Sequence, residues 1–299
     1  MKIVDQDEVL SDSVQKGYCH ILMLADPHFP GRIHEKKKQV LKTASTWNDI
    51  DFAAVLGDIC DICGDTSEYK ASLDFLKLLK KPLIPISGNH DCFFEEGFFP
   101  ASPDGRTKKI KLFKDTFGLP ELYREIKLPW YNLYFLSVDS LNSKYFATIS
   151  DSQLKWFEEK IKQSRKPSIV FFHAPLLEEK TFRFMPALID FVAHPHEELS
   201  RIVQENPSII MWVSGHLHIA PENPYFFNEE ATKNGKMINI LNCDLNGQSI
   251  FAGATLHFEF HEKVWTRSLY LYPNKIEAKI FDHISCEWVE KWNRSYLVS

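Results

Sequence analysis

The stretch Pro85-Ile-Ser-Gly-Asn-His-Asp91 joins an apolar run to an amide, an imidazole and a carboxylate. A buried strand that ends in this way delivers polar side chains to one edge of a sheet. Four other apolar runs end similarly, in Asp26-Pro-His28, Gly57-Asp58, His173 and Gly215-His-Leu-His218. Because ligands of open α/β sheets gather where the parallel strands end, the five runs predict a single polar centre.

The first ninety residues have the pattern of an α/β fold. Residues 18–25, 52–56 and 83–86 are apolar enough to be strands buried on both faces. Between them, residues 34–47 and 68–79 carry apolar side chains at helical spacing. Strands and helices that alternate at such short intervals predict a parallel sheet.

The rest of the chain continues this alternation and then becomes rich in strands. Helices are expected over 107–117, 150–163 and 197–204, and strands over 131–138, 167–172, 208–213, 237–241, 254–260, 263–272 and 276–281. The late strands predict a second sheet packed on the first. We therefore expect one domain over residues 1–299, with a motif-bearing core of 18–245 and a C-terminal β-rich part of 250–299 packed on it.

Composition limits the classes of partner. The chain is 44% hydrophobic and 25% charged, as expected for a globular protein, and its net charge of −5 gives no general attraction to nucleic acid or membranes. No apolar run approaches the roughly 20 residues of a membrane span. Six scattered cysteines suit free thiols, and Cys60-x-x-Cys63 lacks the second pair of a zinc ribbon. We expect a cytoplasmic protein with no membrane or nucleic-acid partner.

The strand ends supply the ligand types of a two-metal hydrolytic site. Two metal ions about 3.5–4 Å apart need a bridging carboxylate and several oxygen or imidazole ligands. The candidates are Asp26, His28, Asp58, Asn89, His173, His216 and His218. The absence of cysteine from this set argues against a structural zinc site.

Each candidate alone has an ordinary structural explanation. His173 could be a buried structural histidine, and Asp58 could cap a helix. The joint occurrence favours a metal centre, because five of the twelve histidines fall in the five blocks. Asp139, which ends a further apolar strand, is an additional candidate for a group beside the ligands.

In order, Asp-x-His, Gly-Asp, Gly-Asn-His-Asp, His and Gly-His-x-His resemble the five motif blocks of the calcineurin-like metallophosphoesterase superfamily. The resemblance spans residues 26–218. It implies a four-layer α/β-β/α sandwich of two mixed sheets flanked by helices, with two divalent or trivalent metal ions such as Mn, Fe or Zn. It further implies that Asp26, His28 and His218 hold one metal, that Asn89, His173 and His216 hold the other, and that Asp58 bridges them.

The chemistry of such a centre predicts a mechanism. Two cations generate a bridging hydroxide near neutral pH, which can attack phosphorus while the metals stabilise the developing charge. His90 is expected to be a general acid or transition-state stabiliser, with Asp91 orienting its imidazole. Phe93 and Phe94 are expected to bind substrate. The aromatic loops 92–100 and 182–191 could form a pocket wall or simply pack over the sheet edge.

Differences between subfamilies narrow the substrate class. Asp61 and Asp91 occupy positions at which protein phosphatases and purple acid phosphatases carry other residues. The motifs that contain these two aspartates are more similar to those of the class III cyclic-nucleotide and glycerophosphodiester phosphodiesterase branch. Ala174 departs from that branch, which often has a second histidine there. We expect a phosphodiesterase acting on a small soluble substrate, which could be a nucleotide.

Three alternatives remain open. A phosphomonoesterase would use the same fold and metals. A nuclease would need a basic groove that the composition does not indicate. A non-catalytic protein-binding scaffold should have lost ligands or His90, and none is missing.

Overall fold

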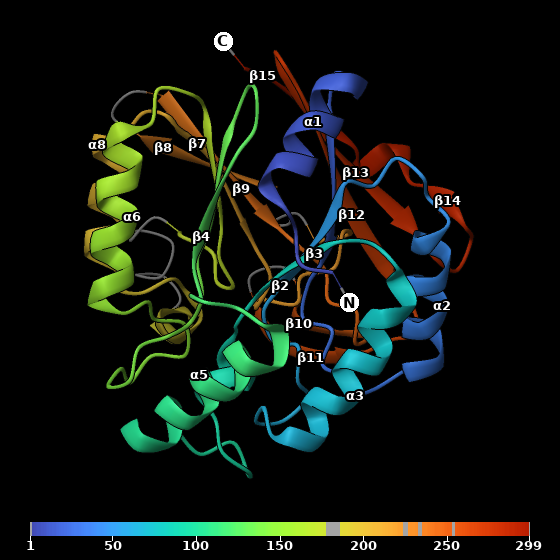
Figure 1. The fold of residues 1–299 in the computed structure, drawn as a ribbon. Helices are drawn as coiled ribbons and strands as arrows, with labels where there is room; N and C mark the ends of the chain where they lie inside the picture. The colour runs from blue at the N-terminus through green and yellow to red at the C-terminus, as the bar shows by residue number, and fades with distance from the viewer. Residues whose placement is uncertain (1, 178–185, 224–226, 233–234, 253–254, 299) are drawn as a thin grey trace.

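The computed structural model describes residues 2–177, 186–223, 227–232, 235–252 and 255–298. Two mixed sheets lie face to face, and helices cover the outer face of each (Figure 1). This arrangement confirms the predicted four-layer sandwich. Among the described residues, no helix is both long and apolar enough to span a bilayer.

The first sheet is built on three parallel strands, β1 (Cys19–Leu24), β2 (Phe52–Leu56) and β3 (Leu83–Ile86). All of their residues are buried, as their continuous apolar runs predict. The sheet continues beyond β1 through β12 (Trp265–Tyr272), β13 (Lys275–Asp282), β14 (Glu287–Trp288) and β15 (Arg294–Leu297), all antiparallel to their neighbours.

The C-terminal strands therefore correct one expectation. They do not build the second sheet but extend the first, in the order β14-β13-β12-β1-β2-β3. The physical reason lies in β1, which would otherwise be an edge strand with a row of unpaired backbone groups. β12 satisfies that edge, with Leu22 opposite Ser268, while β2 pairs on the other side.

The second sheet comes from the middle of the chain. Its order is β4 (Arg124–Lys127), β5 (Asn132–Phe135), β6 (Ser168–Phe171), β7 (Ile209–Ser214), β9 (Gly235–Leu241) and β8 (Phe227–Thr232). The four inner strands are parallel, and β4 and β8 are antiparallel edges. The hairpin β10 (Gln248–Ala252) and β11 (Thr255–Phe260) stands apart as a two-stranded sheet.

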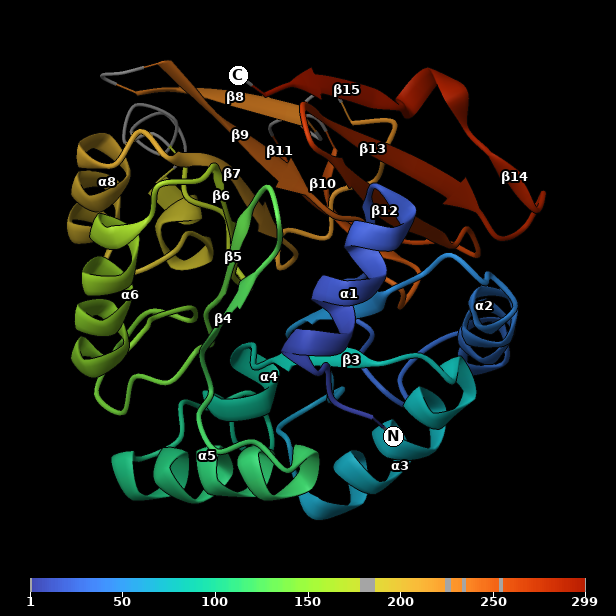
Figure 2. The ribbon, with the colours of Figure 1, turned by 45° about the horizontal axis from the view of Figure 1, so that its top comes forward.

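Helices α2 (His34–Ser45), α3 (Thr66–Leu76) and α5 (Pro103–Phe117) pack on the first sheet, and α6 (Asp151–Gln163) and α8 (His196–Glu205) on the second (Figure 2). Helix α1 (Gln6–Lys16) lies beside β1 and β4. Short helices are η1 (Lys77–Leu79), α4 (Asn89–Cys92), η2 (Pro186–Phe191) and η4 (Glu290–Trp292).

Local sequence explains several of these boundaries. Asp65 and Glu68 form a capping box at the start of α3, and the Ser150 hydroxyl caps α6 by accepting from the Gln153 amide. Gly118, at φ +65°, ends α5 in the left-handed conformation. Residues 182–185 of the loop 182–191 lie outside the described residues, and the rest of the loop is η2.

The two sheets share one apolar core. Met23 and Leu56 from the first sheet pack in it with Phe135 and Phe171 from the second, whose rings stack 4.5 Å apart. This core fixes the sheets relative to each other. The strand ends that carry polar residues are thereby held at one place.

Candidate metal centre

Each predicted ligand follows a strand end closely. Asp26 and Asp58 lie two residues beyond β1 and β2, Asn89 opens α4 just after β3, and His173 and His216 lie two residues beyond β6 and β7. The strands come from both sheets, so the centre lies where the two sheets meet. All seven candidate side chains are buried: Asp26, His28, Asp58, Asn89, His173, His216 and His218.

The seven side chains form two groups that share Asp58. Asp26, His28, Asp58 and His218 place their ligand atoms within 4.8 Å of one another, and so do Asp58, His173 and His216. Asn89 joins the second group, because its Oδ1 lies 2.8 Å from Nε2 of His173. This division is the one that the family resemblance implies, with Asp58 in the bridging position. Direct coordination of metal by each residue stays a prediction.

The backbone of the centre is strained. Asp26, His28, Asp58, His216 and His218 all have positive φ, between 44° and 66°. Residues other than glycine rarely adopt this conformation, and outliers of this kind cluster at functional sites. Five of the seven candidate ligands thus reach the centre only with an unfavourable backbone conformation.

Two glycines allow the loops to approach. A Cβ atom on Gly88 would lie 2.2 Å from Oδ1 of Asp58, and one on Gly215 would lie 2.1 Å from Oδ2 of Asp26. Any side chain at these positions would push a candidate ligand away. The glycines of the Gly-Asn-His-Asp and Gly-His-x-His motifs are therefore needed for space.

The electrostatics of the centre fit bound cations. Burial raises the pKa of Asp26 to about 7, although His218 and His173 act in the opposite direction. Burial, with the neighbouring histidines, also holds the pKa values of His28 and His216 well below the usual range. Burial also acts to lower the pKa of His173, but the Asp58 carboxylate outweighs it and raises that pKa to about 9. A bound cation would take the place of this proton beside the buried carboxylates, because neutral imidazoles are the form that binds metal.

An orphaned atom supports the same conclusion. Nε2 of His216 is buried and has no hydrogen-bond partner among the described residues. Buried polar atoms are normally satisfied, so an unsatisfied ring nitrogen in a ligand cluster fits a metal position. The donor set contains two carboxylates, one amide and four imidazoles, which suits a pair of catalytic first-row metals.

Partners outside the five motifs hold the imidazoles. Nδ1 of His173 donates to the Leu56 carbonyl over 2.8 Å, and Nδ1 of His218 lies 2.9 Å from the carboxylate of Asp244. Such partners orient a metal-binding imidazole and strengthen it as a ligand. Asp244 was not predicted, although it follows the apolar strand β9 just as the candidate ligands follow theirs.

Lys37 holds the loop that carries His28. Its buried ammonium donates to the carbonyls of Pro27, His28 and Pro30 over 2.7, 2.8 and 3.1 Å, and to Oδ1 of Asn246 over 2.7 Å. Four oxygens compensate the ammonium for lost water, although burial lowers the pKa of Lys37 to about 7. Lys37 is the middle one of three consecutive lysines, a pattern that is typical of solvated surface and does not indicate this role.

His90 stands at the rim of the centre. Its side chain is 17% exposed, its backbone N–H donates to Oδ1 of Asp58, and its ring meets the His28 ring edge-on at 4.6 Å. Nδ1 of His90 donates to the Asp61 carbonyl over 2.8 Å. The ring can therefore reach a group bound over the clusters.

The contacts of Asp91 differ from the expectation that its carboxylate orients the imidazole of His90. Its carboxylate accepts from the backbone N–H groups of Gly88, Ile59 and Cys60 at 2.8–3.2 Å. The orienting partner of the His90 ring is instead the Asp61 carbonyl, because Asp91 is needed to fix the backbones of two motif loops. Similarly, Asp139 accepts from Ser150 at the start of α6 and from no candidate ligand among the described residues.

The two predicted substrate residues are both buried but lie at different distances from the centre. The Phe94 ring lies 5.4 Å from the His90 ring and packs edge-on against it. Phe93 lies one ring further from the centre, is 2% exposed and contacts Phe94. The structure therefore places Phe94 beside the centre and Phe93 behind it.

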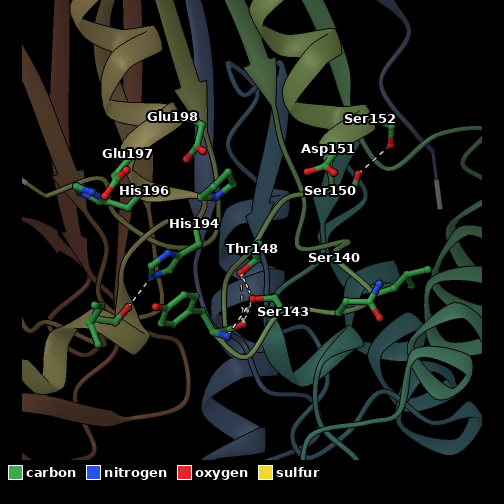
Figure 3. Close-up of a pocket in the computed structure, with 15 residues that line it drawn as sticks. Ser140, Ser143, Thr148, Ser150, Asp151, Ser152, His194, His196, Glu197 and Glu198 are labelled. Carbon is green, nitrogen blue, oxygen red and sulfur yellow. Dashed lines mark hydrogen bonds between the residues drawn. The ribbon is translucent and has the colours of Figure 1, made fainter.

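A separate cavity of about 850 Å³ lies between the 140–152 segment and the start of α8. Hydroxyl groups, carboxylates and two histidines line it (Figure 3). The Tyr145 ring stacks on His194 at 3.7 Å, and His194 is held by the Ile189 carbonyl. None of the seven candidate ligands lines this cavity, so it is distinct from the metal centre.

Comparison with known proteins agrees with the geometry. The profile of the calcineurin-like phosphoesterase family matches residues 19–220. The chain belongs to this family. A curated relative, the glycerophosphodiester phosphodiesterase GpdQ of Enterobacter lignolyticus, is 27% identical over 174 residues, which are 56% of this chain and 56% of GpdQ. The chain thus spans about half the length of that relative.

Solved structures share the fold of this family member. They include a purple acid phosphatase from yellow lupin (TM-score 0.65, 13% identity, 94% of this chain and 54% of that one) and a dimetal phosphatase from Danio rerio (0.59, 14%, 94% and 99%). GAP50, the anchor in the inner membrane complex of Plasmodium, is also similar (TM-score 0.59, 12% identity, 94% of this chain and 89% of that one). At these identities the likeness shows the fold alone.

Proposed function

We propose that the chain is a two-metal phosphoester hydrolase that acts as a phosphodiesterase on small soluble substrates. The observation that carries the proposal is the pair of buried ligand groups joined at Asp58, with His90 at their rim. The curated relative at 27% identity is named for phosphodiester hydrolysis, which favours a diester over a monoester. The free cysteines of the chain suit a cytoplasmic location.

His90 has the geometry of a proton donor. Two metal ions in this centre would activate water and stabilise negative charge on the phosphoryl group. The bond from Nδ1 of His90 to the Asp61 carbonyl fixes the ring and leaves Nε2 to face the reacting group. As an imidazolium, His90 can give the Nε2 proton to the departing oxygen.

The site favours an enzyme over a non-catalytic scaffold. The fold alone does not decide between enzyme and scaffold, because a protein named as an anchor shares it. A scaffold has no need to keep seven candidate ligands buried in strained backbone around His90. A monoesterase or nuclease would use the same centre, and the choice between them is made by substrate assays.

The experiment strips the protein with a chelator and reloads it with Mn, Fe, Zn or Mg. Each form is then assayed on a diester, a monoester, a cyclic nucleotide and a single-stranded oligonucleotide. We expect diester hydrolysis that depends on added metal. A protein that hydrolyses no phosphoester with any metal would support the scaffold alternative.

Two variants and a control assign the residues. His90→Ala should keep both metals and lower kcat about 100-fold or more, because a general acid contributes on the order of a hundredfold. Asp58→Asn should lose metal as well as activity, since it removes the shared charge. His34→Ala, on an exposed side chain, should match the wild type. Unchanged diester hydrolysis in both His90→Ala and Asp58→Asn would refute the proposed site.

A further inference from the structure

Four aromatic rings form an arc along one side of the metal centre. They are Phe98, Phe94, Phe146 and Phe191, and successive ring centroids lie 5.9, 5.4 and 5.5 Å apart. Phe98 contacts the His90 ring at 5.6 Å, and Phe191 contacts the His216 ring at 5.3 Å. This aromatic arc therefore reaches from the proposed proton donor to a candidate ligand of the second group.

The Phe98 side chain is exposed to solvent, and its backbone has an unfavourable conformation. It is 56% exposed and adopts φ +61°, in the left-handed region that bulky residues avoid at a cost of about 1 kcal/mol. The turn is closed by bonds from the Phe98 N–H to the Glu95 carbonyl (3.1 Å) and from the Glu95 N–H to the Phe99 carbonyl (2.8 Å). A ring that served only to fill the core would be neither exposed nor strained.

The arc stands on a rigid base. Phe93 is buried against Phe94 and Phe146, and the Arg106 guanidinium lies 4.1 Å from its ring. Arg106 in turn donates to the carbonyls of Ala101 and Ser140, which joins the loop after α4 to the loop that carries Phe146. Phe94 and Phe146 are thus supported from behind by a packed and hydrogen-bonded base.

The chemistry of the arc identifies what it can bind. Its side chains are hydrocarbon rings, so they offer stacking and desolvation but no polar atom. Planar aromatic groups gain most from such contacts, whatever hydrogen-bonding groups they carry at their edges. The rings lie beside His90, where the departing ester oxygen would receive its proton.

Building on the proposed phosphodiesterase function, we propose that the aromatic arc, with Phe98 at its exposed end, selects diesters whose leaving group carries a planar aromatic ring. Water adds to phosphorus, the P–O bond to that group breaks, and its oxygen leaves with a proton. The products are a phosphomonoester and an alcohol or phenol bearing the ring. Phe98 acts here as a specificity residue.

The test compares the metal-loaded wild type with Phe98→Gly, Phe98→Trp and Phe99→Ala. Phe98→Gly removes the ring and relieves the positive φ, so its thermal stability should not fall below that of the wild type. Phe98→Trp keeps an aromatic ring. Phe99→Ala is the matched control, because Phe99 is 70% exposed in the same turn and lies outside the arc.

Each protein is assayed for kcat/KM on bis-p-nitrophenyl phosphate and on glycerophosphoglycerol, a diester without a ring. We expect the ratio of aryl to alkyl kcat/KM to fall about tenfold or more in Phe98→Gly, as for the loss of one stacking contact. The ratio should be kept in Phe98→Trp and Phe99→Ala. Leaving-group reactivity cancels, because each variant is compared with the wild type on the same substrate.

The outcomes separate this inference from the proposed function. If the wild type hydrolyses both diesters and Phe98→Gly has the wild-type ratio, the selection by the arc is refuted while the phosphodiesterase function stands. An equal fall of the ratio in Phe99→Ala would also refute it, since the effect would then belong to the whole turn. If the wild type hydrolyses no diester, the proposed function itself fails.

Discussion

At the scale of single residues, Asp244 shows how a group outside the five motifs completes the centre. Nε2 of His218 faces the cluster and lies 3.5 Å from Oδ1 of Asp26, while Nδ1 faces Asp244 at 2.9 Å. The carboxylate therefore fixes the ring orientation and its tautomer. Asp244 is itself held by the Gln248 N–H, which donates to it over 3.1 Å.

We expect Asp244→Asn to lower metal affinity about 10- to 100-fold, because loss of a carboxylate behind a ligating imidazole has effects of this size. The measurement is a calorimetric titration of the chelated protein with Mn or Zn. Asp104→Asn, an exposed carboxylate on α5, is the control and should bind like the wild type. Equal affinities for all three proteins would mean that Asp244 does not support His218.

At the scale of elements, Gly88 and Gly118 show two different reasons why a position requires glycine. Gly88 opens the short helix α4 at φ −108°, which any residue can adopt, but a Cβ there would meet Oδ1 of Asp58 at 2.2 Å. Gly118 ends α5 at φ +65°, and a Cβ there would meet no atom within 4 Å. The first glycine is needed for space and the second for backbone conformation.

Gly88→Ala should therefore displace Asp58 and reduce bound metal, whereas Gly118→Ala should keep full metal content and lose only about 1 kcal/mol of stability. Metal stoichiometry by elemental analysis and unfolding in urea give the two readouts. If Gly88→Ala bound both metals normally, the close approach of α4 to Asp58 would not be needed for the centre. If Gly118→Ala lost metal, the effect of a residue on α5 would extend to the site.

The elements also show what the sequence can predict. Continuous apolar runs predict β1, β2, β3, β6 and β7 within a residue or two, because strands buried on both faces need them. The elements that were not predicted include helix α1 and the strands β4, β8, β10, β14 and β15. Helix α1 has few apolar residues, and β4 alternates over only four residues with Lys127 exposed, so their formation depends on tertiary contacts.

Some features of the site can likewise be predicted from the sequence and others cannot. The seven candidate ligands are predictable, since each follows an apolar run and their order matches one family. The partner of the His90 ring is not, because a backbone carbonyl such as that of Asp61 leaves no trace in the sequence. The role that we propose for Phe98 also depends on a turn geometry that the side-chain pattern does not encode.

At the scale of the whole molecule, the C-terminal strands join the first sheet, so the end of the chain pairs with its first strand, β1. β12 pairs with β1 over Cys19 to Met23, and Thr266 on β12 contacts His283 just after β13. The core between the sheets includes residues of β1, β7 and β13 together. We therefore keep the prediction of one domain over 1–299, which should unfold in a single transition.

His283 provides the test. Burial lowers its pKa to about 4 from 6.5, because its ring is enclosed by Trp47 and Phe281 and pairs with the Thr266 hydroxyl over 2.9 Å. Between pH 6.5 and 4 the unfolded chain binds a proton that the folded chain refuses. His283 by itself should therefore cost up to about 3 kcal/mol of stability as pH falls through this window, because a pKa difference of one unit corresponds to about 1.36 kcal/mol.

His283→Gln keeps a partner for Thr266 and removes the titrating group, so the loss over this pH range should shrink by about the same 3 kcal/mol. Urea unfolding at several pH values measures it, with His34→Gln as a control on an exposed histidine. Hydrogen exchange followed at low pH then locates the effect. In one domain, β12 and β13 exchange together with β6 and β7, because protonation of His283 destabilises the shared core. Exchange of β12 and β13 long before β6 and β7 would instead show that the C-terminal strands form a separate unit.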